Sequence, residues 1–289
     1  MRLALGTAQF GSLYGVANTN GQVSQGGAKE ILKYCKAVGI DMLDTAIAYG
    51  ESEQRLGEIG VTGFDLITKL PAIPQLCPNI DEWMMREVKA SISRLHIRSL
   101  YGLMLHRPEQ LFEPYGEVIL KSLYKLKSLG LVKKIGISVY SPEEIEAITA
   151  LFDFDIIQVP FSVVDRRLVT SGWLDKLKAS GTEVHTRSSF LQGLLLIPRD
   201  AIPRQFKAWD HLWNDWHNWL TKNSVSSLEG CMAFSLSFPG INKVVIGVDT
   251  QGQLEQIVLS ASKYVKPMPI PDISCNDIDL INPANWKML

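Results

Sequence analysis

Four polar side chains have types and positions that together suit proton transfer. Asp44, Lys69 and His106 each end a short apolar segment, and a tyrosine, Tyr49, follows the first of them after a brief turn. An unpaired carboxylate at the end of a buried strand is unfavourable, so we expect Asp44 to pair with Lys69. A lysine ammonium beside a phenol favours release of the phenol proton, which would let Tyr49 donate a proton at neutral pH. His106 would donate a hydrogen bond to a substrate oxygen as a neutral imidazole.

The elements that must position these side chains are eight short apolar segments, which we predict to be buried strands. They are residues 3–7, 40–45, 64–69, 101–106, 132–138, 155–160, 182–188 and 243–247. Segments with helical periodicity separate most of them, and several of these end at a glycine. The predicted helices include residues 27–38, 81–95, 117–129, 142–151, 171–179 and 226–238, with a further one beginning near Ser52.

Eight βα units in one chain predict an α/β fold, the (β/α)8 TIM barrel, whose functional groups lie at the carboxyl ends of the strands. The ends of nearly all the predicted strands are polar, which agrees with that arrangement. A doubly wound open sheet is the alternative fold, but the GxGxxG pattern expected after its first strand is missing.

Size and composition limit the class of protein. The chain has 289 residues, of which 46% are hydrophobic, and a formal net charge of -1. These values suit one large domain or two small ones, and the repeated units favour a single domain over 1–289 with a loop-like tail, 267–289, over the barrel surface. The balanced charge argues against a nucleic-acid partner, and no apolar run is long enough to span a membrane. Four scattered cysteines without metal-ligand spacing predict no metal site and a reducing, cytoplasmic location.

A long segment between the seventh and eighth predicted strands contains four tryptophans. They are Trp209, Trp213, Trp216 and Trp219. Aromatic residues at helical spacing usually pack against other helices, so we expect packing residues here rather than a ligand site.

Over nearly its whole length the sequence resembles the aldo-keto reductase family. The matching pieces include Gly6-Thr7, Leu43-Asp44-Thr45-Ala46, Tyr49-Gly50-Glu51-Ser52-Glu53, Thr68-Lys69, Leu105-His106-Arg107-Pro108, Ile135-Gly136-Ile137-Ser138, Gln158 and Gln192-Gly193-Leu194-Leu195. The resemblance implies a (β/α)8 barrel that passes hydride between a nicotinamide cofactor, commonly NADPH, and a carbonyl or alcohol. It also implies that Tyr49 is the general acid in reduction, that Lys69 and Asp44 tune it, and that His106 orients the carbonyl.

The resemblance further implies cofactor-binding residues at several strand ends. Ser138 and Gln158 would hydrogen-bond the nicotinamide carboxamide, although Val139 stands where the family often has Asn. Arg187 occupies the position of an aromatic residue that commonly stacks on the nicotinamide. Its guanidinium could lie flat on that ring, or it could equally pair with Asp165.

The segment 246–257 resembles the family's last cofactor element, a turn that holds the far end of the cofactor. Gly247, Gln253 and Gln256 are its candidate binding residues, with Gly6 and Thr7 from the first strand. The turn contains no cation, only Lys243 before it, although a 2′-phosphate needs strong donors. Asp249 would instead accept from a ribose hydroxyl. NADP (NADPH) is the cofactor that the family implies, and NAD is the alternative.

Three functions are compatible with these features. The first is an NAD(P)-dependent reductase or dehydrogenase acting on a small carbonyl compound or sugar. The second is a nicotinamide-binding redox sensor or regulatory subunit with weak catalysis. It is suggested by the departures at Val139 and Arg187 and by Ile257, which stands where the family has Asn. The third is a lyase or isomerase that uses Lys69 as a Schiff base, and it rests on a single lysine at a strand end.

Overall fold

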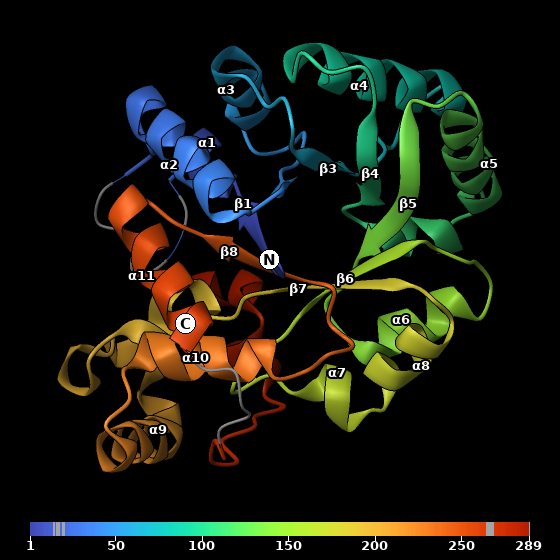
Figure 1. Cartoon of the computed structure of the whole chain (residues 1–289). Helices are drawn as coiled ribbons and strands as arrows, with labels where there is room; N and C mark the ends of the chain where they lie inside the picture. The colour runs from blue at the N-terminus through green and yellow to red at the C-terminus, as the bar shows by residue number, and fades with distance from the viewer. Residues whose placement is uncertain (14, 16–17, 19–20, 264–268, 289) are drawn as a thin grey trace.

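Eight parallel strands close into a barrel in which each strand pairs with its neighbour in the chain and β8 pairs with β1 (Figure 1). The structure is a computed structural model and describes residues 1–13, 15, 18, 21–263 and 269–288. The strands are β1 (Leu3–Gly6), β2 (Met42–Asp44), β3 (Asp65–Leu70), β4 (Leu100–Leu105), β5 (Val132–Ser138), β6 (Ile156–Pro160), β7 (Glu183–Arg187) and β8 (Lys243–Gly247). The predicted (β/α)8 TIM barrel is confirmed, and all eight predicted strands are present.

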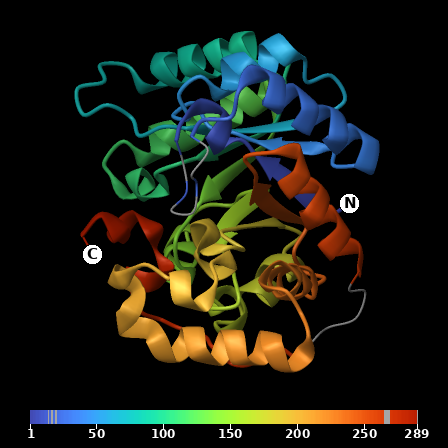
Figure 2. The same cartoon turned by 90° about the vertical axis from the view of Figure 1, so that its left-hand side faces the viewer.

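Helices surround the barrel on its outer side (Figures 1 and 2). The α-helices are α1 (Ala8–Gly11), α2 (Gln25–Val38), α3 (Ser52–Ile59), α4 (Ile80–Arg94), α5 (Gly116–Ser128), α6 (Pro142–Thr149), α7 (Arg167–Thr170), α8 (Trp173–Ala179), α9 (Asp210–Asn223), α10 (Ser227–Leu236), α11 (Gln251–Lys263) and α12 (Ile278–Ile281). Short 3-10 helices are η1 (Pro108–Phe112), η2 (Leu191–Leu196), η3 (Arg199–Ala201), η4 (Arg204–Trp209) and η5 (Pro283–Met288).

Two layers of apolar side chains hold the barrel together. Inside it, a small cluster of Ala4, Met42, Ile67, Met104 and Ile156 fills the centre. Outside it, one large cluster joins the strands to the surrounding helices. Successive residues of a strand face opposite sides of the sheet, so every second residue faces the inside of the barrel. Polar residues occupy such inward-facing positions at the carboxyl ends of the strands.

The segment between β7 and β8 forms the predicted excursion, with α9 lying across the molecule (Figure 2). Trp213 and Trp216 are fully buried, and the indole rings of Trp216 and Trp219 stack with centroids 5.6 Å apart. The indole N–H of Trp213 donates to the carbonyl of Phe206. These tryptophans are therefore packing residues, as predicted.

The carboxyl-terminal tail differs from the loop-like extension that was predicted. Pro267, Met268 and Leu289 lie outside the described residues, but the rest contains α12 and η5. Asp277 caps α12 through its side chain, and the buried ring of Trp286 packs against Phe206 with centroids 4.8 Å apart. An Asn/Asp-rich composition hid these helices, because a capping aspartate and one buried tryptophan are sufficient to fix them.

The segment 246–257 also differs from the predicted turn, since it becomes helix α11 from Gln251 onward. Leu254, Ile257 and Val258 are buried, with the three-to-four spacing of a helix face. The ligand-binding turn is thus limited to the few residues between β8 and α11.

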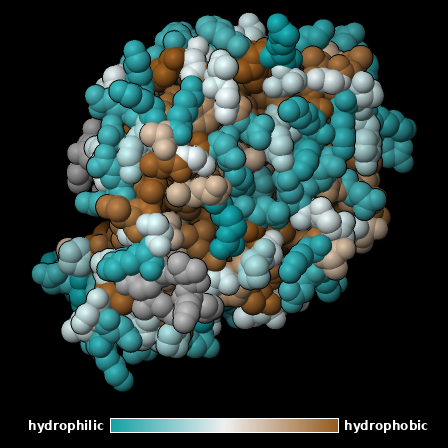
Figure 3. Space-filling model, viewed as in Figure 1, coloured by the Kyte–Doolittle hydropathy of each residue, from teal (hydrophilic) through white to brown (hydrophobic). Residues whose placement is uncertain are grey.

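The face of the molecule seen in Figure 3 is largely hydrophilic. In Figure 3 hydrophilic side chains cover most of the face, and hydrophobic ones gather mainly left of its centre. None of the helices in the described part of the chain is both long and apolar enough to cross a membrane.

Candidate active site

A buried ion pair lies at the carboxyl ends of β2 and β3. The Nζ atom of Lys69 is 2.5 Å from Oδ1 of Asp44 and also donates to the carbonyl of Thr45 at 3.1 Å. Lys69 is 1% exposed and Asp44 is 4% exposed. Burial lowers the pKa of Lys69, but the charges of Asp44 and Tyr49 outweigh burial and raise that pKa above its ordinary value. Lys69 is therefore a positively charged group throughout the neutral pH range.

Tyr49 and His106 lie beside this pair. The Nζ atom of Lys69 is 5.3 Å from the centroid of the Tyr49 ring. The Tyr49 and His106 rings meet edge to face, with centroids 6.0 Å apart and planes at 82°. Burial and the positive charges of Lys69 and Arg187 lower the pKa of His106 to about 4. His106 is thus a neutral imidazole at pH 7, with one N–H to donate.

The position of Tyr49 depends on two glycines that let backbones approach closely. A Cβ on Gly11, at the end of α1, would lie 1.6 Å from the carbonyl oxygen of Tyr49. A Cβ on Gly50 would lie 2.4 Å from the carbonyl oxygen of Gly11, and Gly50 has a φ of +53°. The turn that carries Tyr49 is therefore pressed against α1.

Ser138 and Gln158 continue the polar chain away from Asp44. The amide Nε2 of Gln158 donates to Oδ2 of Asp44 at 2.8 Å, and the hydroxyl of Ser138 donates to Oε1 of Gln158 at 3.4 Å. Gln158 lines the cavity, whereas Ser138 does not. Both ends of the Gln158 amide already have protein partners, so this amide orients Asp44 in addition to any contact with a ligand.

Arg187 ends β7 and reaches across to the end of β5. Its guanidinium carbon lies 4.5 Å from the centroid of the Tyr140 ring, and Nη2 donates to the carbonyl of Val139 at 3.1 Å. The alternative that Arg187 pairs with Asp165 is wrong, because that carboxylate binds Arg167 at 2.8 Å. Within the described residues no carboxylate lies within ion-pair distance of Arg187, which leaves a positive charge on the cavity wall.

A cavity of about 370 Å³ extends from Asp44, Tyr49, Gln158 and Arg187 to β1, β8 and the loop after β7. Lys69 and His106 are not among the described residues that line it. Its walls include the predicted cofactor residues Gly6, Thr7, Gln158, Arg187, Gly247, Gln253 and Gln256, together with Asp44 and Tyr49. A Cβ on Gly247 would lie 2.5 Å from Nε2 of Gln9, at the end of a flexible side chain, so Gly247 and the Gln9 amide pack closely on this wall. Thr7 is buried, and its hydroxyl donates to the carbonyl of Asp44, so its side chain holds the strand ends together.

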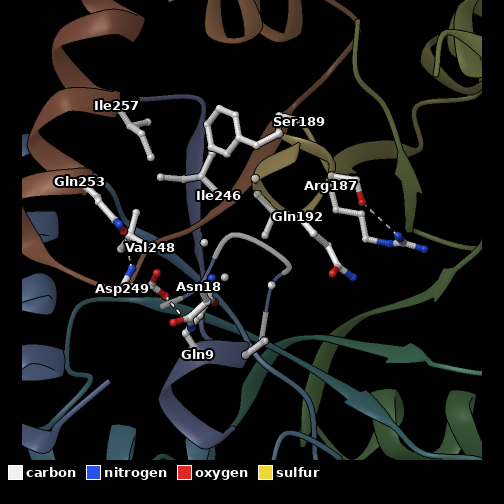
Figure 4. A pocket seen from close by; sticks show the side chains of 18 of the residues that line it. Gln9, Asn18, Arg187, Ser189, Gln192, Ile246, Val248, Asp249, Gln253 and Ile257 are labelled. Carbon is white, nitrogen blue, oxygen red and sulfur yellow. Dashed lines mark hydrogen bonds between the residues drawn. The ribbon is translucent and has the colours of Figure 1, made fainter. Parts of the chain in front are cut away.

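Asp249 lies at the side of the cavity opposite Arg187 (Figure 4). Its Oδ1 accepts from Nδ2 of Asn18 at 3.3 Å, and its backbone N–H donates to Oε1 of Gln253 at 2.7 Å. Lys243, the cation expected nearest to this turn, begins β8 at the opposite end of the strand and pairs with Asp41 at 2.6 Å. Lys243 is therefore not part of the cavity.

The loop after β7 supplies cavity residues that were not among the predicted cofactor-binding residues, namely Ser188, Ser189, Phe190, Gln192, Gly193 and Leu196. Ser188, Leu191 and Gln192 have positive φ angles of 67°, 48° and 52°, a strained backbone typical of functional loops. Ser189 lines the cavity and is 2% exposed, and its buried hydroxyl has no hydrogen-bond partner among the described residues. The polar run at residues 186–189, directly after a buried strand, is the signal that could have indicated them.

The described residues contain no group of three or more His, Cys, Asp and Glu side chains that could hold a metal ion. Cys35, Cys77, Cys231 and Cys275 are free thiols. Burial raises the pKa of Cys35 to about 12. A thiol with so high a pKa stays protonated and unreactive at neutral pH.

The structure is a closed (β/α)8 barrel with a buried lysine–carboxylate pair beside a tyrosine and a histidine. The profile of the Aldo/keto reductase family matches residues 2–273. The chain therefore belongs to the aldo/keto reductase family.

Relatives with this similarity include proteins described as uncharacterized oxidoreductases of Mycobacterium bovis and Mycobacterium tuberculosis. They are 31% identical over 144 residues, which are 48% of this chain and 42% of each relative. The match thus covers less than half of the length of these curated relatives.

Solved structures show the same fold. A putative aldo-keto reductase from Pseudomonas aeruginosa superposes with a TM-score of 0.68 at 20% identity, covering 92% of this chain and 91% of that one. An aldo-keto reductase from Bacillus halodurans in its holo form gives a TM-score of 0.71 at 20% identity, covering 94% and 89%. At such low identity these likenesses establish the barrel alone.

Proposed function

We propose that this protein is an NAD(P)(H)-dependent oxidoreductase that interconverts a carbonyl, in an aldehyde, ketone or sugar, with the corresponding alcohol. The observation that carries the proposal is the buried Lys69–Asp44 pair, which sits beside Tyr49 and His106 at one end of a cavity. Family membership and the oxidoreductase descriptions of the relatives support the same class of reaction.

Tyr49 is the general acid in the reducing direction. Its side chain lines the cavity, and the positive charge of Lys69 beside the ring stabilises the phenolate that remains when the proton leaves. Asp44 holds Lys69 charged and in place, and Gln158 in turn holds Asp44. The same groups acting in reverse accept the proton from an alcohol.

His106 orients the substrate oxygen. Because burial and the charges of Lys69 and Arg187 lower its pKa to about 4, the ring donates a hydrogen bond without carrying a charge. A neutral donor aimed at the carbonyl oxygen supports the developing negative charge in the transition state.

The cavity is the site that would hold the nicotinamide dinucleotide. Its volume of about 370 Å³ lies in the range of ligand pockets. The partnerless hydroxyl of Ser189 and the side chains of Gln192, Gln253 and Gln256 are the donors that would hold it. When bound, the nicotinamide supplies the hydride in reduction and accepts it in oxidation.

A Schiff-base mechanism at Lys69 is disfavoured. A lysine nucleophile must be neutral and reachable by the substrate, whereas Lys69 is 1% exposed and its pKa is raised. The sensor alternative would require the cofactor site without a working proton donor. A buried ion pair adds little net stability, so its position beside Tyr49 favours a role in catalysis over a role in binding alone.

The test is the variant Tyr49→Phe, which removes only the phenol oxygen. Loss of a general acid should lower kcat by about 10² to 10⁴-fold, while cofactor affinity by calorimetry changes little. Consumption of reduced cofactor with a panel of aldehydes, ketones and sugars measures the activity. Tyr124→Phe, on the exposed surface of α5, is the matched control. Full turnover in Tyr49→Phe would reject the assignment, and tight cofactor binding with no turnover of any carbonyl by the unmodified protein would favour the sensor.

A further inference from the structure

The end of the cavity remote from Tyr49 has no positively charged side chain among its described lining residues. Three segments, 3–28, 188–198 and 244–262, supply all of its lining residues except Asp44, Tyr49, Gln158, Arg187 and Leu228. None of these three segments contains a Lys, an Arg or a His. The positive charge that the described cavity lining does carry, Arg187, belongs to the reaction end, because it acts on the pKa values of both Lys69 and His106.

The remote end instead carries a carboxylate. Asp249 lines the cavity there and accepts from the neutral amide of Asn18 (Figure 4). Burial raises the pKa of Asp249, partly offset by the hydrogen bond with Gln253, and no positively charged group of the described residues contributes to this shift. The remaining side chains at this end are amides and aliphatic groups such as Gln253, Gln256 and Ile257.

The start of α11 does not compensate for the missing cations. A helix N-terminus attracts phosphate through its free N–H groups, but the hydroxyl of Thr250 takes up one of them here by accepting from the N–H of Gln253. The N–H of Leu254 makes the first bond within the helix, to the carbonyl of Thr250. Lys263 ends α11, about 18 Å along the helix axis from Gln251, and pairs with Glu229.

We infer that this protein selects NAD(H) over NADP(H), with Asp249 as the residue that determines the choice. This inference rests on the proposed function, because it concerns the same dinucleotide site. A 2′-phosphate carries between one and two negative charges and is normally held by Arg or Lys. An unphosphorylated ribose offers hydroxyl donors instead, which a carboxylate accepts well.

Calorimetric titration of the full-length protein with NADH and with NADPH tests the inference directly. We expect NADH to bind at least tenfold more tightly. Binding of NADPH as tight as or tighter than that of NADH would overturn the selectivity and leave the proposed function standing. Absence of binding by either dinucleotide would overturn both.

Two variants test the role of Asp249. Asp249→Ser should lower the ratio of the NADPH dissociation constant to the NADH dissociation constant at least threefold, mainly because NADPH binds more tightly. Adding Gln253→Arg, at an exposed position on α11 that lines the cavity, should reverse the preference. Asp153→Ser removes an exposed carboxylate before β6 and is the control for a change in net charge. If Asp249→Ser and Asp153→Ser have the same NADH/NADPH ratio as the unmodified protein, Asp249 does not determine the choice.

Discussion

Removing either member of the Asp44–Lys69 pair should destabilise the fold far more than removing both. With 2.5 Å between the charged atoms, their attraction is about 7 kcal/mol at an effective dielectric constant near 20. Desolvation of two nearly fully buried ions offsets most of this attraction, so the intact pair adds little net stability. Loss of one partner, however, leaves the other charge buried without compensation.

We therefore expect Lys69→Met and Asp44→Asn each to lower the free energy of unfolding by about 3–5 kcal/mol. The double variant should recover much of that loss, giving a coupling free energy of at least ~3 kcal/mol in a double-mutant cycle. Urea unfolding of the four proteins measures these values from the midpoints at constant m. All three variants should lack turnover, and the folded double variant separates this loss from instability.

A surface ion pair provides the matched control. Lys121 and Glu117 face each other one turn apart on α5 at 3.2 Å, with side chains 77% and 81% exposed. The cycle of Lys121→Met and Glu117→Gln should give a coupling of at most ~0.5 kcal/mol, because solvent screens the pair. A coupling free energy for Asp44 and Lys69 as small as that for the surface pair would show that the two groups do not form a coupled buried pair.

Two further predictions concern His106 and Gly11. The pKa of His106 is about 4 in the fold, against 6.5 for an ordinary histidine, so the unfolded chain binds more protons between these values. The free energy of unfolding should fall by about 3 kcal/mol as pH drops through that window, and His106→Gln should remove this part of the pH dependence in urea unfolding; identical slopes would contradict it. Gly11→Ala should force the turn bearing Tyr49 outward, costing about 1–3 kcal/mol of stability and most of the activity. Gly26→Ala on α2, whose Cβ would have no heavy atom within 4 Å, should cost neither, and equal activities in the two variants would refute the steric argument.

The strands were predictable because each is a short apolar run with a polar end. The predicted bounds of β5 and β8 agree with the structure at both ends, and the remaining strands differ by one or two residues. Parallel strands in a barrel bring their carboxyl ends together, so the meeting of Asp44, Lys69 and His106 followed from the strand ends alone. Local sequence was sufficient for these features.

Contacts between distant side chains were not predictable in the same way. The amide of Gln158 reaches Asp44 from 114 positions along the chain, and Arg187 turns toward Tyr140 rather than Asp165. Such choices depend on side-chain length and on the strand stagger of the closed barrel, which periodicity does not encode. Helix α11 is different, because the spacing of its apolar residues does indicate a helix, and the resemblance to a binding turn obscured it.

The charges at the reaction end also bear on which side chain delivers the proton. Burial, followed by the positive charges of Lys69 and Arg187, lowers the pKa of His106 to about 4, and the carboxylate of Asp44 offsets only part of this shift. A ring with that pKa carries no additional proton at neutral pH, so it can donate a hydrogen bond but is a poor general acid. A neutral His106 therefore agrees with the proposed roles, in which Tyr49 is the acid and His106 orients the substrate.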